Sequence, residues 1–266
     1  MALRVATWNI NSVRLRIDMV TRFLAEYQPD VLCLQETKSP DGAFPTAAFE
    51  EAGYPHLEIA GMKGYNGVAV VSKHPLSNGE SFDRCGKSDC RHVAASLADG
   101  TEIHSIYIPA GGDEPDRKKN EKFDHKLNFV TELTEWFPAK RSTKNPIIAV
   151  GDFNIAPLET DVWSHKQLLN VVSHTPIEVE HLDKMQASFK WHDAVRGYLG
   201  EEDKIYSWWS YRARDWEASD RGRRLDHIWV TPPLADKVTN AEILKPIRGW
   251  EPKPSDHCPV MIDLDV

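Results

Sequence analysis

The chain has 266 residues, of which 41% are hydrophobic and 27% are charged, and its formal net charge is −8. This composition is typical of a soluble globular protein, and the length suits one large α/β domain or two small ones. No apolar run approaches a membrane span, and the first ten residues form a strand-like pattern instead of a signal peptide. The acidic balance argues mildly against a nucleic-acid partner, although a metal ion held by carboxylates reverses the charge locally.

The four cysteines predict no disulfide framework. Cys33 and Cys258 lie in apolar strand-like segments, where a small buried thiol is expected. Cys85 and Cys90 are four residues apart, without the second pair of ligands that a zinc site needs. This use of cysteine is typical of a reduced, cytosolic protein.

Hydrophobic periodicity predicts more strands than helices. The expected strands, in chain order, are Leu3–Thr7, Val31–Leu34, Gly67–Val71, His92–Leu97, Glu102–Ile108, Pro146–Val150, Ile205–Tyr211, Leu225–Val230 and Cys258–Leu264. The expected helices are Val13–Glu26, Lys122–Trp136, Asp161–Leu168 and Val179–Phe189. The strands follow one another at both hairpin-like and crossover spacings. This pattern favours an α/β (α+β) protein in which two mixed sheets stack with helices outside, as a single domain over residues 1–266.

The first expected helix shows the pattern best. Ile17, Val20 and Phe23 lie on one apolar stripe, and Ser12 is placed to cap the helix.

The segment "GDFNIAP" at 151–157 directly follows the apolar strand "NPIIAV". Alternation along an extended chain places Asp152 and Asn154 on the same face. Asp and Asn also stabilise turns at strand ends, so these two residues alone fit a turn as well as a functional site.

Several other strands end or begin with polar residues of the same kind. Taken singly, each has a simple structural interpretation: Glu36 as a surface charge, Asp226 as an ion-pair partner of Arg223 or Arg224, and His257 as a hydrogen-bonded core residue. Together they favour a functional site, because sites are commonly built at strand ends on a packed scaffold. The polar residues at strand ends are Asn9, Asn11, Glu36, Lys38, Tyr107, Asp152, Asn154, Asp226, Asp256 and His257.

The residue types in this set define the expected chemistry. Carboxylate and amide oxygens without cysteine suit magnesium or manganese, and a histidine beside a carboxylate suits proton handling near neutral pH. Together they indicate metal-assisted attack of water on a phosphate ester. The chain has no G-x-S-x-G, P-loop or dinucleotide-binding motif, which argues against a serine hydrolase or a nucleotide-binding enzyme.

The ordered motifs "WNIN", "LQETK", "GDFN", "RLDHIWV" and "SDHCPV" resemble those of the endonuclease/exonuclease/phosphatase superfamily. "YIPAGG" at 107–112 and "YSWWSYR" at 206–212 narrow the resemblance to exonuclease III-type apurinic/apyrimidinic endonucleases. The resemblance implies a DNase I-like, four-layer αββα sandwich, in agreement with the expected elements.

The resemblance also implies a metal site. Glu36 resembles the principal ligand of a Mg²⁺ ion, which Mn²⁺ could replace, with Asn9 and Asp256 close to the same ion. Asp152, Asn154 and His257 could hold a second metal, and the sequence leaves one or two metals open.

Catalytic roles follow from the same resemblance. Asp152 matches the residue that activates or aligns the attacking water, and Asn154 matches its partner. His257 resembles the imidazole that faces the phosphate, with Asp226 selecting its tautomer. Tyr107 resembles a residue near the phosphate and the leaving oxygen.

Substrate contacts are expected from a further set of residues. Lys38 follows the "QETK" pattern and is expected to tune Glu36. Trp208 matches an aromatic wall that packs on a base-free sugar, beside Leu225, whereas Trp209 reads equally well as a core aromatic. At Arg223 the family is more often apolar, and a cation there could pair with a phosphate or with a nearby acid. Lys126 and Arg212 belong to basic clusters expected to hold flanking phosphates, although the lysine cluster alone also fits a solvated helix surface.

The resemblance therefore predicts a magnesium-dependent DNA repair nuclease that cuts the backbone 5′ to an abasic site and also acts on 3′ ends. Its expected partner is double-stranded DNA with abasic sites or 3′ ends, and it is expected to act as a cytoplasmic monomer without a membrane partner. Two alternatives remain: a superfamily phosphoesterase acting on inositol phosphates or phospholipid, and a non-catalytic DNA-binding protein that has kept the fold.

Overall fold

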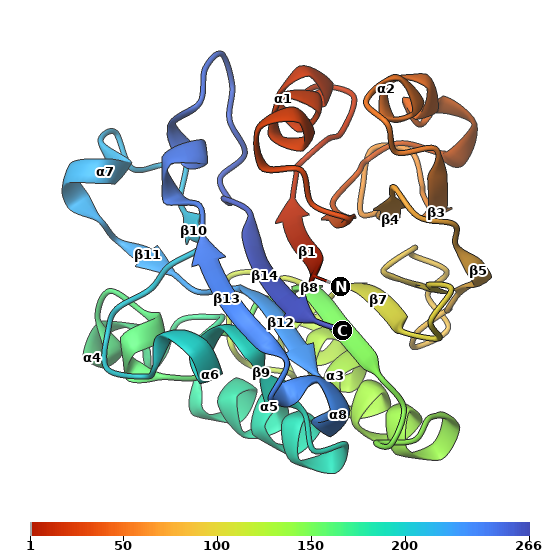
Figure 1. Cartoon of the computed structure of the whole chain (residues 1–266). Coiled ribbons are helices and arrows are strands. Elements are labelled where there is room, and N and C mark those ends of the chain that lie inside the picture. The colour runs from red at the N-terminus through yellow and green to blue at the C-terminus, as the bar shows by residue number, and fades with distance from the viewer. Residues whose placement is uncertain (1) are drawn as a thin grey trace.

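A computed structural model describes residues 2–266, in which two six-stranded sheets stack face to face (Figure 1). The strand order of the first sheet is β13 (Val238–Ile243), β14 (Val260–Asp265), β1 (Ala2–Asn9), β2 (Val31–Gln35), β4 (Val68–Ser72) and β3 (His56–Ala60). The order of the second is β5 (Ser77–Ser81), β6 (His92–Ser96), β7 (Glu102–Tyr107), β8 (Ile147–Asp152), β12 (Asp226–Val230) and β9 (His192–Asp193). Each sheet contains one parallel pair, β1–β2 or β7–β8, so both sheets are mixed.

Helices cover the two outer faces. The α-helices are α1 (Ile17–Tyr27), α2 (Thr46–Glu51), α3 (Glu121–Lys140), α4 (His165–Leu168), α5 (Pro176–Ser188), α6 (Ala194–Leu199), α7 (Trp216–Ser219) and α8 (Pro232–Ala235). Helices α1 and α2 lie against the first sheet, and α3 and α5 lie against the second (Figure 1). Apolar side chains of each helix pair join a buried cluster with the strands beneath it. The two mixed sheets with helices outside confirm the four-layer αββα architecture.

Period-two alternation explains how each strand serves two cores. In β8, Ile148 and Val150 point into the core between the sheets, whereas Ile147 and Ala149 point toward α3 and α5. A strand buried on both faces reads as a continuous apolar run, which is why "IIAV" predicts a strand so clearly.

Several element boundaries differ from the sequence prediction. Helix α1 begins at Ile17 instead of Val13, and Ser12 does not cap it, because Ser12 and Asn11 adopt positive φ and the helix follows Arg16. The expected helix Asp161–Leu168 splits into a 3-10 turn that ends at Asp161 and the short α4.

Other strands were misplaced or missed. The expected strand Ile205–Tyr211 contains only β10 (Trp208–Trp209), which pairs with β11 (Gly222–Arg223). The edge strands β5 and β13 lacked an apolar run that would reveal them, because polar side chains suit their exposed positions. Within residues 2–266, no helix is both long enough and apolar enough to cross a membrane.

The backbone at Gly151 sets the approach of β8 to β7. Gly151 has a φ of 144°, and a Cβ added there would lie 1.9 Å from the carbonyl oxygen of Ile106 in the paired strand. Only glycine therefore allows this pairing, which places the next residue, Asp152, opposite Tyr107.

We expect Gly151→Ala to lower the free energy of unfolding by about 2–4 kcal/mol, because the added methyl group forces β8 away from β7. Urea denaturation of both variants measures this effect. The matched control is Gly197→Ala in α6, where the added Cβ meets nothing within 4 Å and stability should rise slightly. Equal stability of the two variants would contradict the close approach of the strands.

Candidate active site

The register of the second sheet brings three polar side chains into one row. Asp152, at the end of β8, pairs with Tyr107 in the parallel strand β7 and with Asp226 in the antiparallel strand β12. Residues directly opposite each other in neighbouring strands point to the same face. The row therefore presents a phenol and two carboxylates together.

The first sheet contributes residues from the ends of β1 and β2. Asn9 is fully buried, and its Nδ2 donates hydrogen bonds of 2.8 Å to both Glu36 Oε1 and Asp152 Oδ2. The amide nitrogen must face the two carboxylates, because only a donor satisfies both. Tyr107 also donates to Glu36 Oε1, at 2.9 Å. One amide and one phenol thus link the ends of the two sheets.

His257 completes the cluster from the loop before β14. Its Nδ1 donates to Asp226 Oδ2 at 2.8 Å, and its Nε2 lies 3.6 Å from Asp152 Oδ2. The carboxylate of Asp226 accepts only, so it selects the Nδ1–H form of the ring and leaves Nε2 toward Asp152. Ser255 holds this loop, since its Oγ accepts from the His257 N–H at 3.2 Å and donates to the Asn9 carbonyl at 2.6 Å.

Burial and neighbouring charges shift the protonation of this cluster. Burial, together with the negative charge of Asp226, raises the pKa of Asp152 to about 7, and His257 opposes the rise. Burial acts to lower the pKa of His257, but the carboxylates of Asp226 and Asp152 outweigh it and raise this pKa to about 10. At neutral pH the imidazole therefore carries a positive charge that compensates the buried carboxylates.

Glu36 and Tyr107 have opposite protonation preferences. Burial would raise the pKa of Glu36, but the nearby Lys38 ammonium and the Asn9 amide lower it below its usual range. Burial and the Glu36 carboxylate raise the pKa of Tyr107 well above its usual value. Glu36 is therefore ionised, and Tyr107 keeps its proton and acts as a hydrogen-bond donor.

A second polar chain connects Glu36 with Asp256. Lys38 Nζ lies 2.8 Å from Glu36 Oε2 and donates to Asn11 Oδ1 at 2.6 Å, and Asn11 Nδ2 contacts Asp256 Oδ1 at 3.2 Å. Trp208 Nε1 donates to the other oxygen, Asp256 Oδ2, at 3.0 Å. Asn11 was only one of several polar residues at strand ends in the sequence, and the structure shows that it bridges two of the expected site residues.

The oxygen-rich cluster fits a divalent cation. Asp152, Asp226 and His257 each offer a ligand atom within 4.8 Å of the others, and Asp226 Oδ1 is buried without a hydrogen-bond partner. Glu36, ionised and about one-fifth exposed, reaches the same cleft. Such hard oxygen donors favour magnesium or manganese over softer metals. The side chain of Asn154 does not join this cluster, because its Nδ2 donates to the Ile108 carbonyl at 2.9 Å. The backbone N–H of Asn154 donates to Asp152 Oδ1, also at 2.9 Å.

Glu36, Asp152 and His257 line a cleft of about 700 Å³, together with Asn154. Trp208 and Leu225 form an aromatic and apolar wall on one side, and the exposed Arg212 and Arg221 lie at the same cleft. Trp209 points away into a core with Tyr206 and is a structural aromatic. The cleft therefore combines a polar floor with a wall suited to a sugar or a base.

The expectation that Lys126 contacts DNA is wrong. Lys126 is completely buried in α3, where its ammonium forms an ion pair with Glu178 of α5 and donates to the Asn154 carbonyl at 2.7 Å. Glu178 also accepts from the Ser173 and Thr175 N–H groups. The pair ties the loop of Asn154 to the start of α5, which is a positioning role. "TPIE" at 175–178 is a capping-box signal that could have revealed Glu178 in the sequence.

Arg224 does not pair with Asp226 either. It is buried and holds Asp161 and Asp193 at 2.7 Å, so Asp226 remains available to His257.

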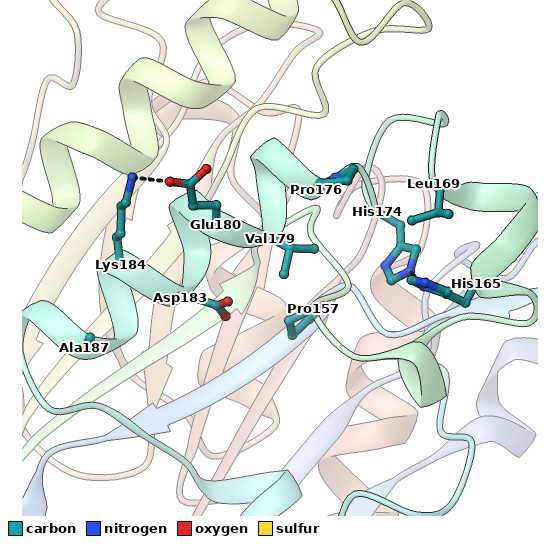
Figure 2. A pocket seen from close by; sticks show the side chains of 10 residues that line it. All are labelled: Pro157, His165, Leu169, His174, Pro176, Val179, Glu180, Asp183, Lys184 and Ala187. Carbon is teal, nitrogen blue, oxygen red and sulfur yellow. Dashed lines mark hydrogen bonds and ion pairs between the residues drawn. The ribbon is translucent and has the colours of Figure 1, made fainter.

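A separate hollow of about 540 Å³ lies between α5 and the segment that contains α4 (Figure 2). His165 and His174 point toward each other at one end, with 2.8 Å between Nδ1 and Nε2, and Lys184 pairs with Glu180 on the exposed face of α5 (Figure 2). The residues that line this hollow differ from those that line the cleft of Asp152 and His257, so the two cavities are separate.

Residues 6–257 match the Endonuclease/Exonuclease/phosphatase family. The chain belongs to this family. It is 31% identical to exodeoxyribonuclease III of Haemophilus influenzae, over 98% of this chain and 100% of that protein. It also resembles an AP endonuclease structure from Archaeoglobus fulgidus, with a TM-score of 0.92 and 32% identity over 99% and 100% of the two chains. The 3′ phosphatase NExo from Neisseria, solved with a product DNA hairpin, has a TM-score of 0.89 and 28% identity over 99% and 100%. These findings confirm the predicted resemblance to exonuclease III-type AP endonucleases and its fold.

We expect Lys126→Met to lower the free energy of unfolding by about 3–5 kcal/mol, because it leaves the Glu178 carboxylate buried without its counter-charge. Thermal or urea unfolding measures this loss. The control is Lys184→Met, which removes the exposed ion pair to Glu180 on α5 and should change stability little. DNA affinity of the folded Lys126→Met protein should match the wild type, and a salt-dependent loss of affinity would restore Lys126 as a DNA contact.

Proposed function

We propose that this protein is a DNA repair nuclease that hydrolyses the phosphodiester 5′ to an abasic site and also removes nucleotides or blocking groups from 3′ ends. The observation that carries the proposal is the buried network at the floor of the cleft. It joins Glu36, Asp152 and the Asp226–His257 pair beside the wall formed by Trp208. Relatives named exodeoxyribonuclease III, AP endonuclease and 3′ phosphatase support the same class of substrate.

Each residue of the network has a separate role in the proposed hydrolysis. Asp152, whose pKa is raised to about 7, accepts a proton from the attacking water, and Asn154 helps to hold its carboxylate. The His257 imidazolium faces the phosphate and stabilises the negative charge that develops there, while Asp226 keeps the ring oriented. Tyr107 keeps its proton, donates a hydrogen bond to Glu36 Oε1 and so orients this carboxylate beside the phosphate and the leaving oxygen.

Glu36, with Asp256 and Asn9 nearby, would hold Mg²⁺, for which Mn²⁺ is a substitute. When bound, the ion supplies positive charge to the phosphate oxygens. Lys38 and Asn9 keep the Glu36 carboxylate ionised, and Tyr107 orients it with a hydrogen bond. A second ion at Asp152, Asp226 and His257 would require His257 to lose the proton that it carries at neutral pH, so a single ion at Glu36 agrees better with the protonation of the site.

Although the protein is acidic overall, positive side chains at the cleft can bind DNA. The chain carries a net charge of −8, but Arg212 and Arg221 are exposed at the cleft and can contact flanking phosphates. We propose that it acts as a monomer on chromosomal DNA in the cytoplasm.

One assay separates this proposal from its two alternatives. The protein is incubated with an abasic-site duplex, a plain duplex and a phosphoinositide, each with and without magnesium. We expect magnesium-dependent cleavage of the abasic duplex and slower shortening of plain 3′ ends. Cleavage of the phosphoinositide alone would indicate a lipid-directed phosphoesterase, and binding of DNA without any cleavage would indicate a non-catalytic protein.

Glu36→Ala should abolish incision at ordinary magnesium concentrations, because it removes the principal carboxylate from the proposed metal site, and excess manganese should restore part of the activity. Incision of an abasic duplex is measured across a metal titration. Glu51→Ala, on the exposed surface of α2, is the control and should behave as the wild type. Unchanged turnover of Glu36→Ala would remove Glu36 from the metal site.

Trp208→Ala should lower incision at abasic sites much more than shortening of plain 3′ ends, because the aromatic wall is expected to pack on the base-free sugar. The ratio of the two activities, measured at one ionic strength, is the readout. Equal loss of both activities, or loss of neither, would show that Trp208 does not select the abasic residue.

A further inference from the structure

Arg223 occupies an unusual position in the catalytic cleft. Its guanidinium carbon lies 5.2 Å from the centre of the Trp208 ring, and one NH₂ group donates to the Val172 carbonyl at 2.9 Å and to Ser173 Oγ at 2.7 Å. Arg223 lines the same cleft as Asp152 and His257. The guanidinium is thus held in a fixed orientation beside the reacting groups.

This cation has no anionic partner. Within residues 2–266 no carboxylate forms an ion pair with Arg223, and its Nε is buried without any acceptor. The neighbouring Arg224 instead forms ion pairs with two aspartates. The negative charge of Glu178 acts to raise the pKa of Arg223, but Glu178 forms its ion pair with Lys126. Arg223 is half-buried, with its Nε enclosed, and partial desolvation of a guanidinium without a counter-charge is costly. An anion supplied from outside the chain would compensate it.

The segment that holds Arg223 is rigid. The Ser173 N–H donates to both carboxylate oxygens of Glu178 at 2.9 Å, and the Ser173 carbonyl accepts from Ala156 at 2.8 Å. Because Glu178 is tied to Lys126, the support of Arg223 extends into the packed helices α3 and α5. A preorganised donor of this kind binds an oxyanion without losing further side-chain freedom.

We propose that Arg223 binds an oxyanion on the 3′ side of the scissile phosphate. A planar guanidinium suits phosphate and carboxylate oxygens, and two sources fit this chemistry. One is the next backbone phosphate of an abasic strand. The other is the carboxylate of an oxidised sugar fragment that blocks a 3′ end. The inference rests on the proposed function, because it assumes that the fragment 3′ to the cut lies in the cleft against Trp208.

Two matched pairs of substrates test the proposal. In the first pair, a 3′-phosphoglycolate end is compared with a 3′-(2-hydroxyethyl) phosphate end, which has a similar size but no carboxylate. In the second, a tetrahydrofuran abasic site with an ordinary phosphate on its 3′ side is compared with the same site carrying a neutral methylphosphonate there. The kcat/KM of each substrate is measured for the wild type and for Arg223→Gln, Arg223→Lys and Arg22→Gln.

Arg223→Gln should lower kcat/KM by about 10–100-fold on the charged member of at least one pair and leave the neutral member nearly unchanged. The pair that responds identifies the source of the anion. Arg223→Lys should recover part of the loss, since it keeps the charge without the planar fork. Arg22→Gln is the control: Arg22 pairs with Glu26 on the exposed surface of α1, outside the cleft, and its loss should leave kcat/KM on every substrate close to the wild-type value. Equal effects of Arg223→Gln on both members of both pairs would overturn the proposal.

Binding in EDTA gives a second readout that does not require turnover. The wild type should prefer the charged member of the responding pair, and Arg223→Gln should lose that preference while its thermal unfolding stays cooperative. If the wild type cut none of these substrates, the proposed function would fail, and the binding preference would still decide the role of Arg223. Absence of any charge preference in the wild type would overturn the inference even where cleavage is normal.

Discussion

The site depends on the register of one strand. β8 runs between a parallel and an antiparallel neighbour, and this places Asp152 opposite Tyr107 on one side and Asp226 on the other. A shift of β8 by one residue would turn Asp152 to the other face of the sheet, away from Tyr107 and Asp226. Gly151 protects this register, because its missing side chain lets the backbones of β7 and β8 approach closely. The geometry of the site is thus an extension of strand pairing.

The two sheets must also be held in a fixed relation at the same end, and buried polar contacts do this. Asn9 bridges Glu36 and Asp152, and Ser255 ties the His257 loop to the carbonyl of Asn9. Buried carboxylates are costly unless they are hydrogen-bonded or paired, and each of these has such a partner. The same interactions that limit this cost orient the groups for chemistry.

Away from the chemistry, buried ion pairs support the walls of the cleft. Lys126 and Glu178 connect α3, α5 and the loop of Asn154, and Arg224 holds Asp161 and Asp193. If one member of such a pair moves away, the other remains as an uncompensated buried charge, which is energetically costly. The pairs therefore favour the one arrangement of the surrounding loops that keeps both members together. Arg223 contrasts with them, because it is half-buried and held by the Val172 carbonyl and the Ser173 hydroxyl instead of an acid. That difference separates a residue that supports the fold from one that is available to a ligand.

Local patterns in the sequence predict the architecture and most of the polar residues that meet at the cleft. These patterns include buried strands such as "IIAV", the apolar stripe of α1 and the polar residues at strand ends. A local pattern can be recognised from the order of residues along one segment. The ordered motifs around Asn9, Glu36, Asp152, Asp226 and His257 added the family.

The tertiary structure is needed to tell which charged residues line the cleft and which are paired in the core. Lys126 and Arg223 both appear in basic clusters in the sequence, yet one is paired in the core with a glutamate 52 positions away and the other lines the cleft without an acid. Edge strands and short helices were also misjudged, because their stability comes from neighbours distant in the chain more than from their own composition. The burial of a charged side chain and its ion-pair partner depend on residues far away in the chain. The pattern along one segment therefore cannot predict them.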